Sequence, residues 1–178
     1  DLGDFRAAGW DRDIAMHMRR GGRVIGICGG YQMLGRRVTD PLGIEGSERE
    51  VEGLGLLDVE TEMAPEKTVR NSRARSLQYD VPLEGYEIHL GRTAGPDALN
   101  PSVSIDGRPD GAISPDGRVM GTYLHGLLSS DAYRARLLAD FGIEGGGFDY
   151  RAGVDAALDG VAAELEAVLD RRWLGDLL

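Results

Sequence analysis

The sequence predicts an α/β fold, in which an open sheet with a parallel core carries a strand-rich extension. Residues 23–27 form a short, almost continuously apolar run, which is typical of a strand buried on both faces of a parallel sheet. A lone cysteine, two glycines and a helical pattern follow this run directly. A series of mostly antiparallel strand patterns comes next, and two helical patterns close the chain. This order of elements indicates the α/β class.

Apolar residues recur at helical spacing over residues 2–20, which predicts a helix with a candidate break near Gly9. Gly21 and Gly22 end this pattern before the apolar strand at 23–27. A second helix is expected over 30–36, with Met33 and Leu34 facing inward.

The centre of the chain reads as a turn-rich loop at 40–46 followed by short strands. Asp106-Gly107 is a hairpin-turn signal between two weak strands, and Asp116-Gly117 is a second turn signal. The expected strands are 54–61, 67–79, 86–90 closed by Gly91, 103–105, 111–114 and 119–124.

Two helices are expected near the C-terminus. Ser130 opens the first, which runs through Asp140. The second runs from Asp149 to about Trp173 and has one apolar face. That face consists of Val154, Leu158, Val161, Leu165, Val168 and Leu169.

Composition excludes several classes of function. The chain has 178 residues with 20 basic and 30 acidic side chains, a net charge of 20 − 30 = −10, which disfavours a nucleic-acid surface. No apolar run is long enough for a membrane span, and no signal peptide is recognisable. A single cysteine fits a reducing, cytoplasmic compartment. The start at Asp1, without Met, suggests a piece of a longer protein.

Cys28 is the strongest candidate for chemistry. It lies between the end of a strand and the start of a helix, where backbone N–H groups and the helix dipole favour a thiolate. Gly29 and Gly30 permit a sharp turn and the close approach of a substrate. The pattern resembles a nucleophile elbow with Cys in place of Ser. The alternative is a buried structural cysteine.

A cysteine nucleophile needs a base, and the chain has three histidines. His125 ends a strand, the place where open sheets build their sites, and Gly126 leaves access to it. His89 also ends a strand and shares a face with Glu87, so these two either line the cleft or pair on an exposed sheet face. His17, in an arginine-flanked helix, is expected to be incidental.

These residues predict acyl transfer. The Cys28 thiolate would attack a carbonyl carbon, and backbone N–H groups near Gly29 would hold the oxyanion. His125 would protonate the leaving group and then activate water.

The run from Cys28 to Gln32, with the distant His125, resembles class I (triad-type) glutamine amidotransferases. Five longer strings narrow the resemblance to the cobyric and cobyrinic branch, and within it to the C-terminal glutaminase domain of cobyric acid synthases. The strings are 26–35, 40–46, 52–61, 85–89 and 121–126. The resemblance implies one amidotransferase domain over residues 1–178, a flavodoxin-like open sheet that is N-terminally incomplete.

The resemblance also implies a role for each site residue. A thioester on Cys28 would release ammonia from glutamine, with Gly29 as an oxyanion donor and Gln32 in contact with the substrate. Glu87 and His89 are further candidates for substrate binding. No cofactor and no metal site are expected in this domain.

The implied partner is an N-terminal ATP-binding synthetase domain that is absent from this chain. ATP and Mg²⁺ are expected there, together with a corrin substrate. Ammonia would amidate the b, d, e and g carboxylates of adenosylcobyrinic acid a,c-diamide.

The chain departs from the triad pattern in two places. Leu127 stands where triad enzymes carry Glu, two residues after the histidine, so a Cys–His dyad is expected and Glu87 or a backbone carbonyl is left to orient His125. In the family, a strand and an oxyanion loop precede the position of Asp1. That loop would supply a second hydrogen-bond donor to the oxyanion. Because this chain lacks the loop, the piece alone is expected to be weakly active or inactive.

Other functions fit parts of the pattern. The cobyrinic acid a,c-diamide synthase branch shares the dyad, although Gln32 and the 40–46 loop favour the cobyric branch. A glutaminase that amidates a peptidoglycan lipid precursor is a second neighbour. A non-catalytic pseudo-glutaminase would keep only the interface with its partner domain. A cysteine hydrolase of peptides or esters would carry the same thiol, base and oxyanion pocket as a glutaminase.

Overall fold

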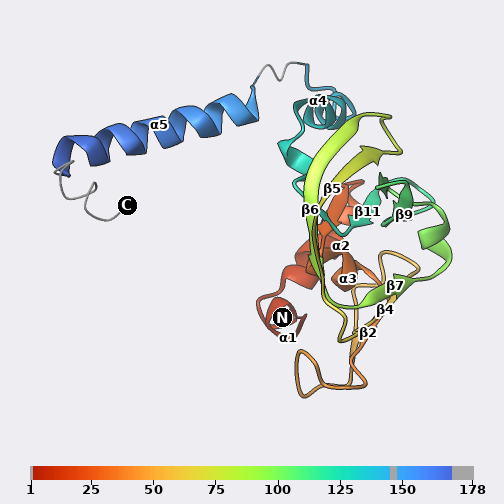
Figure 1. The fold of residues 1–178 in the computed structure, drawn as a ribbon. Helices are drawn as coiled ribbons and strands as arrows, with labels where there is room; N and C mark the ends of the chain where they lie inside the picture. The colour runs from red at the N-terminus through yellow and green to blue at the C-terminus, as the bar shows by residue number, and fades with distance from the viewer. Residues whose placement is uncertain (1, 145–147, 170–178) are drawn as a thin grey trace. The chain divides into compact units, whose positions relative to one another are not determined.

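The computed structural model describes residues 2–144 and 148–169. The chain divides into two compact units, residues 1–127 and 128–178. Figure 1 follows the elements from the N-terminus in red to the C-terminus in blue. Among the described residues, no helix is long and apolar enough to cross a membrane.

The described helices are α1 (Leu2–Ala7), α2 (Trp10–Arg19), α3 (Gly29–Leu34), α4 (Asp131–Ala139) and α5 (Tyr150–Val168), with 3₁₀ turns at Pro96–Leu99 and Leu127–Ser129. The described strands are β1 (Val24–Ile27), β2 (Arg37–Thr39), β3 (Glu50–Glu52), β4 (Glu60–Glu62), β5 (Thr68–Ser76), β6 (Pro82–His89), β7 (Arg92–Ala94), β8 (Val103–Ile105), β9 (Arg108–Asp110), β10 (Ala112–Ile113), β11 (Val119–Thr122) and β12 (Leu124–His125).

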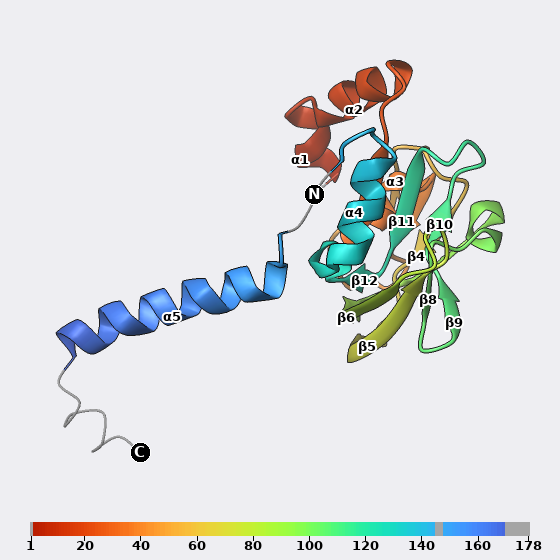
Figure 2. The same cartoon turned by 90° about the horizontal axis from the view of Figure 1, so that it is seen from above.

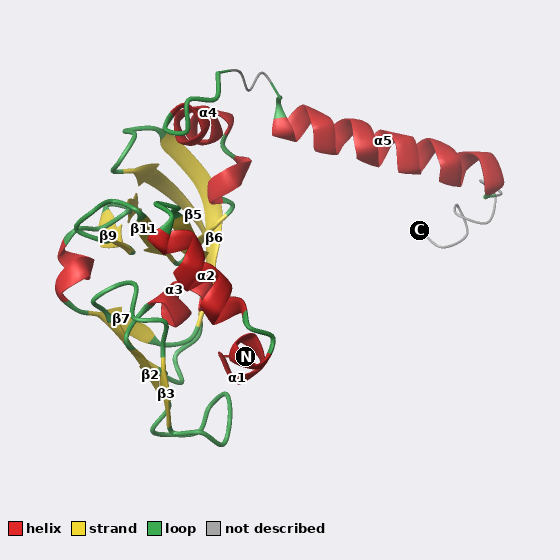
Figure 3. Cartoon of the chain, turned by 180° about the vertical axis from the view of Figure 1, so that it is seen from behind, coloured by secondary structure: helices red, strands yellow, loops and turns green. Residues whose placement is uncertain are grey.

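The N-terminal helical pattern forms two helices, α1 and α2, as predicted. Gly9 separates them with a φ of 84°, a left-handed conformation that glycine adopts without a Cβ clash. Both helices appear in red in Figure 3.

The first sheet has the strand order β1-β11-β10 and carries α3. β1 runs parallel to β11, so that Val24 faces Val119 and Ile27 faces Thr122. Tyr31 and Leu34 of α3 are buried and belong to the core cluster. The strand at 23–27 is therefore confirmed. Its predicted burial on both faces is wrong: within the described residues β1 is an edge strand, and only Gly26 is fully buried.

The second sheet is antiparallel and has the strand order β12-β6-β5-β8-β9. β5 and β6 run side by side as a long hairpin, which Figures 2 and 3 both show. They confirm the strands expected at 67–79 and 86–90, and β6 begins earlier, at Pro82.

The turn at Asp106-Gly107 is confirmed, with φ values of 48° and 79°. Its returning strand is β9, however, and not 111–114 as predicted. Ala112 and Ile113 form β10 instead, which pairs with β11 around the expected turn at Asp116-Gly117.

The third sheet has the strand order β3-β2-β4-β7, and it corrects the strand predicted at 54–61. Only Glu60 and Thr61 of that range are in a strand. The backbone N–H groups of Leu56 and Leu57 both donate to the Leu34 carbonyl at the end of α3. This segment therefore satisfies a helix terminus, and its alternating apolar residues do not reflect strand pairing.

The strand predicted at 119–124 is divided at Tyr123. β11 ends at Thr122 in the first sheet, and β12 begins at Leu124 in the second. Asp110 accepts hydrogen bonds from the Thr122 hydroxyl (2.6 Å) and the Tyr123 backbone N–H (3.0 Å), which holds the chain at this crossing.

The unit 128–178 contains α4 and α5. The Ser130 side chain caps α4 by accepting from the Tyr133 N–H, and Asp149 caps α5 by accepting from the Ala152 N–H. Both helix starts are as predicted. The predicted end of the second helix, near Trp173, lies outside the described residues.

Candidate active site

Cys28 occupies a strained turn between β1 and α3, as the nucleophile-elbow pattern predicts. Its backbone angles are φ 55° and ψ −115°, a conformation that side chains other than glycine rarely adopt. Its N–H donates to the Thr122 carbonyl on the neighbouring strand (2.9 Å). Gly26 makes the turn tight, because a Cβ there would lie 2.7 Å from the Gly30 backbone. The sheet and the helix therefore hold the cysteine in this conformation.

The two glycines that follow Cys28 border open space. A Cβ built at Gly29 or at Gly30 would meet nothing within 4 Å. Packing within the protein therefore does not require glycine at these positions, whereas a substrate approaching Cys28 would benefit from the space. The Gly29 N–H acts on the sulfur and lowers the pKa of the thiol, which places it where an oxyanion donor is expected.

The pKa of Cys28 lies above the ordinary value of a thiol. Burial raises this pKa, the Glu45 carboxylate raises it further, and the Gly29 N–H opposes them only in part. α3 has six residues, so its dipole is short and does not offset the loss of solvation. The thiol donates to the Ile88 carbonyl of β6 at 3.3 Å.

Gln32 lies one helical turn after Cys28, and its N–H donates to the Cys28 carbonyl (3.2 Å). Its side-chain nitrogen donates to the Leu90 carbonyl (2.9 Å) and to the Tyr123 hydroxyl (3.2 Å). The Tyr123 hydroxyl also bonds the Thr93 hydroxyl (2.6 Å). With its two N–H groups engaged, Gln32 has its carbonyl oxygen left to accept a hydrogen bond from a ligand.

His125 is in β12, directly opposite Tyr86 of β6. The two rings stack with centroids 4.7 Å apart and planes 1° from parallel. Among the described residues, the buried Nε2 atom of His125 has no hydrogen-bond partner. Leu127 is fully buried, so a core side chain takes the position where triad enzymes carry their glutamate. The structure brings Cys28 and His125 to the same strand, β6, through Ile88 and Tyr86.

Glu87 and His89 share a face of the sheet, as predicted, but it is the face opposite to His125. In the register of β12 and β6, Glu87 is opposite Leu124, whereas His125 is opposite Tyr86. Glu87 therefore does not orient His125. The roles of Glu87 and His89 in substrate binding remain predictions.

Glu87 is buried in an ionic cluster. Its Oε2 accepts from Arg70 (2.5 Å), Ser72 (3.2 Å) and Arg108 (3.3 Å). His89 Nε2 lies 3.8 Å from the other carboxylate oxygen.

The His89 ring stacks on Tyr123, with centroids 3.9 Å apart. Burial lowers the pKa of His89, against the opposing effects of Glu87 and Asp110. His17, by contrast, contacts the Arg23 carbonyl through its ring Nε2 (3.0 Å), a local structural contact.

The sequence did not indicate two aromatic residues of the site, Tyr86 and Tyr123. Each contacts a functional side chain across the fold: Tyr86 stacks on His125, and Tyr123 bonds Gln32. Both tyrosines lie within the motifs 85–89 and 121–126, and this position was the signal in the sequence that could have pointed to them. Their contacts depend on the register between strands, which the motifs do not give.

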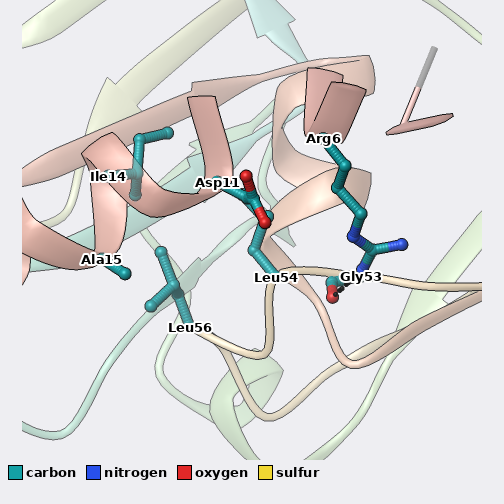
Figure 4. A pocket seen from close by; sticks show the side chains of 7 residues that line it. All are labelled: Arg6, Asp11, Ile14, Ala15, Gly53, Leu54 and Leu56. Carbon is teal, nitrogen blue, oxygen red and sulfur yellow. Dashed lines mark hydrogen bonds between the residues drawn. The ribbon is translucent and has the colours of Figure 1, made fainter. Parts of the chain in front are cut away.

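A separate cavity of about 200 Å³ lies between the N-terminal helices and the 53–56 loop, and Figure 4 shows its lining. Arg6 reaches across it and donates to the Gly53 carbonyl (3.0 Å). The lining residues are Arg6, Asp11, Ile14, Ala15, Gly53, Leu54 and Leu56. Since no predicted site residue is among them, this cavity is distinct from the cysteine site.

Residues 1–133 match the CobB/CobQ-like glutamine amidotransferase domain. A cobyric acid synthase of Sinorhizobium sp is 78% identical over 178 residues, which are 100% of this chain and 37% of that protein. The cobyric acid synthase of Rhizobium meliloti (strain 1021) is 75% identical over the same extent. The chain thus spans 37% of the length of these relatives and matches their C-terminal part.

The fold has a counterpart among solved structures. The crystal structure of a glutamine amidotransferase superposes with a TM-score of 0.53 and 14% sequence identity. The match covers 78% of this chain and 71% of the other chain. This likeness confirms the predicted fold class.

Proposed function

This chain belongs to the family of CobB/CobQ-like glutamine amidotransferase domains, and we propose that it hydrolyses glutamine through a thioester on Cys28. One observation carries the assignment of the nucleophile: Cys28 is held in a strained elbow, beside the open space at Gly29. Strain at such a position costs about 1–3 kcal/mol and persists where the surrounding structure enforces it.

In the first step the thiol sulfur attacks the γ-carboxamide carbon of glutamine. Because the pKa of Cys28 is raised, the thiol proton must leave as the S–C bond forms. We assign the imidazole of His125 as its acceptor, since its Nε2 is not used in a structural hydrogen bond within the described residues. The Gly29 N–H stabilises the oxyanion.

In the second step the C–N bond breaks. His125 returns the proton to the leaving nitrogen, so that ammonia departs and the glutamyl thioester remains on Cys28. Water then attacks the thioester carbon, and glutamate and the free thiol are released. The Gln32 carbonyl oxygen accepts a hydrogen bond from the bound substrate during both steps.

We further propose that the ammonia serves the ATP-dependent amidation of corrin carboxylates, as the names of the relatives suggest. The two relatives described above are cobyric acid synthases that are 78% and 75% identical to this chain, which favours adenosylcobyrinic acid a,c-diamide as the acceptor over the substrates of the neighbouring branches. ATP and Mg²⁺ would be bound by the N-terminal part of the longer protein, and no cofactor is proposed for this domain.

A chimera tests this proposal. This chain replaces the matching C-terminal 37% of the Sinorhizobium sp cobyric acid synthase. We expect glutamate release from glutamine and amidation of cobyrinic acid diamide with ATP, and Cys28→Ala should abolish both. With ammonium chloride supplied in place of glutamine, the Cys28→Ala chimera should still amidate. Glutamine-dependent turnover that survives Cys28→Ala would refute the assignment of Cys28.

A further inference from the structure

The imidazole of a Cys–His dyad must be held in one orientation, and this chain lacks the carboxylate that does so in triad enzymes. Leu127 occupies that position as a fully buried apolar side chain. Glu87, the carboxylate that the sequence offered for this role, lies on the opposite face of the sheet in contact with Arg70 and Arg108. Another group must therefore fix the ring of His125.

We propose that Tyr86 is the positioning residue for His125, and that ring stacking replaces the missing carboxylate. This inference rests on the proposed function, in which His125 transfers the proton. The two residues are directly opposed in the β6–β12 pair, so their side chains leave the same face of the sheet as neighbours. Their rings are within 1° of parallel at a centroid distance of 4.7 Å.

Stacking constrains the imidazole differently from a carboxylate. A carboxylate would accept a hydrogen bond from one ring nitrogen, whereas the face of Tyr86 fixes the ring plane and leaves the nitrogens available. In agreement, His125 Nε2 is buried and has no hydrogen-bond partner among the described residues.

The stacked pair also lies close to the thiol along β6. Cys28 donates to the carbonyl of Ile88, which is two residues from Tyr86 on this strand. Two residues of a strand span about 7 Å. A ring held over Tyr86 is therefore within the reach of a substrate bound at Cys28.

The test compares Tyr86→Phe with Tyr86→Leu in the chimera. Phe keeps the ring and removes the hydroxyl, so kcat for glutamate release should stay within about twofold of wild type. Leu removes the ring, and we expect kcat to fall about 10- to 100-fold with little change in KM, since misplacement of a catalytic group acts on the chemical step. In a His125→Asn background, Tyr86→Leu should cause no further loss. Val69→Ala, at an exposed position opposite Ile88 on the same hairpin, is the matched control and should leave kcat unchanged.

A second measurement does not depend on turnover. The ring protons of His125 should carry a ring-current shift in the NMR spectrum that Tyr86→Phe preserves and Tyr86→Leu removes. Wild-type kcat in Tyr86→Leu, an equal loss in both Tyr86 variants, or a His125 shift unchanged by Leu would each overturn the proposal. A wild-type chimera without glutaminase turnover would refute the proposed function instead, and the His125 shift would still decide whether Tyr86 holds the ring.

Discussion

Cys28 adopts backbone angles that suit glycine better than any residue with a side chain. Its φ of 55° results from the turn between β1 and α3, and the short contacts around Gly26 leave the turn little freedom. The residue that the proposed chemistry requires is therefore not the residue that the backbone prefers. This conflict between stability and function can be measured at a single position.

We predict that Cys28→Gly is more stable than Cys28→Ala. Glycine relieves the roughly 1–3 kcal/mol of strain that a side chain meets at this positive φ, and its greater freedom in the unfolded chain offsets part of that gain. Urea unfolding should give a difference of about 0.5–1 kcal/mol. At Glu52, which is exposed in β3 and has no positive φ, the Gly variant should be the less stable of the two. The same order at both positions would contradict strain at Cys28.

The raised pKa of Cys28 predicts a pH dependence. Iodoacetamide reacts with the thiolate, so the rate of Cys28 alkylation should rise with pH and reach its midpoint above the ordinary thiol value of 9.0. Glu45→Gln removes a neighbouring negative charge and should move this midpoint to lower pH. Glu48→Gln, in the same exposed loop, should not move it. A midpoint near neutral pH in the wild-type chain would contradict the raised pKa of this partly buried thiol.

The Tyr123 hydroxyl is predicted to act through Gln32. Tyr123→Phe removes a hydrogen bond worth about 1 kcal/mol, so KM for glutamine should rise about fivefold while kcat changes less. Initial rates of glutamate release measure both constants. Tyr150→Phe, in the other compact unit, should change neither. An unchanged KM in Tyr123→Phe would show that Gln32 does not depend on this contact.

At the scale of elements, the placement of β12 against β6 determines where His125 lies. Gly85 makes this pairing possible, because a Cβ there would lie 1.9 Å from the His125 carbonyl oxygen. We predict that Gly85→Ala displaces β12, costs about 1–3 kcal/mol of unfolding free energy and abolishes most glutaminase turnover. Gly46→Ala, at a position open within 4 Å, is the control and should retain both. Wild-type turnover in Gly85→Ala would show that β12 does not fix His125.

The elements that the sequence predicted well are those whose signal is local. The strands around β5 and β6, the turn at Asp106-Gly107 and the Ser130 cap all follow from alternation or from turn and capping residues. The strand predicted at 54–61 is wrong because the N–H groups of Leu56 and Leu57 donate hydrogen bonds to the end of α3. This tertiary interaction overrides the alternating pattern. The division at Tyr123 depends on Asp110, which contacts that crossing from another hairpin.

In the candidate site, too, residues of a single short motif were predicted from the sequence, whereas contacts between distant parts of the chain were not. Cys28, Gly29 and Gln32 belong to one short motif, and the motif alone predicts the elbow and the helix that carry them. His125 was predicted from its place at the end of a strand. Its stacking on Tyr86, and the separation of Glu87 from it, depend on the register between β6 and β12. That register pairs residues from distant parts of the chain, and alternation within either strand does not reveal it.

At the scale of the whole molecule, the family and the proposed partner domain indicate where ammonia from the cysteine site would be used. The chain matches the C-terminal 37% of its cobyric acid synthase relatives, so ammonia made at Cys28 would be used by the remainder of such a protein. In the proposed reaction, it is Cys28 of this chain that carries the glutamyl group.

The most direct test is to trap that intermediate. The chimera, turning over isotopically labelled glutamine, is quenched in acid and digested, and the peptide that contains Cys28 is analysed by mass spectrometry. We predict a labelled glutamyl adduct on Cys28 that accumulates during turnover and is lost when the peptide is treated with hydroxylamine. Steady glutamate release with no adduct on Cys28, or with the label on another residue, would show that Cys28 is not the nucleophile.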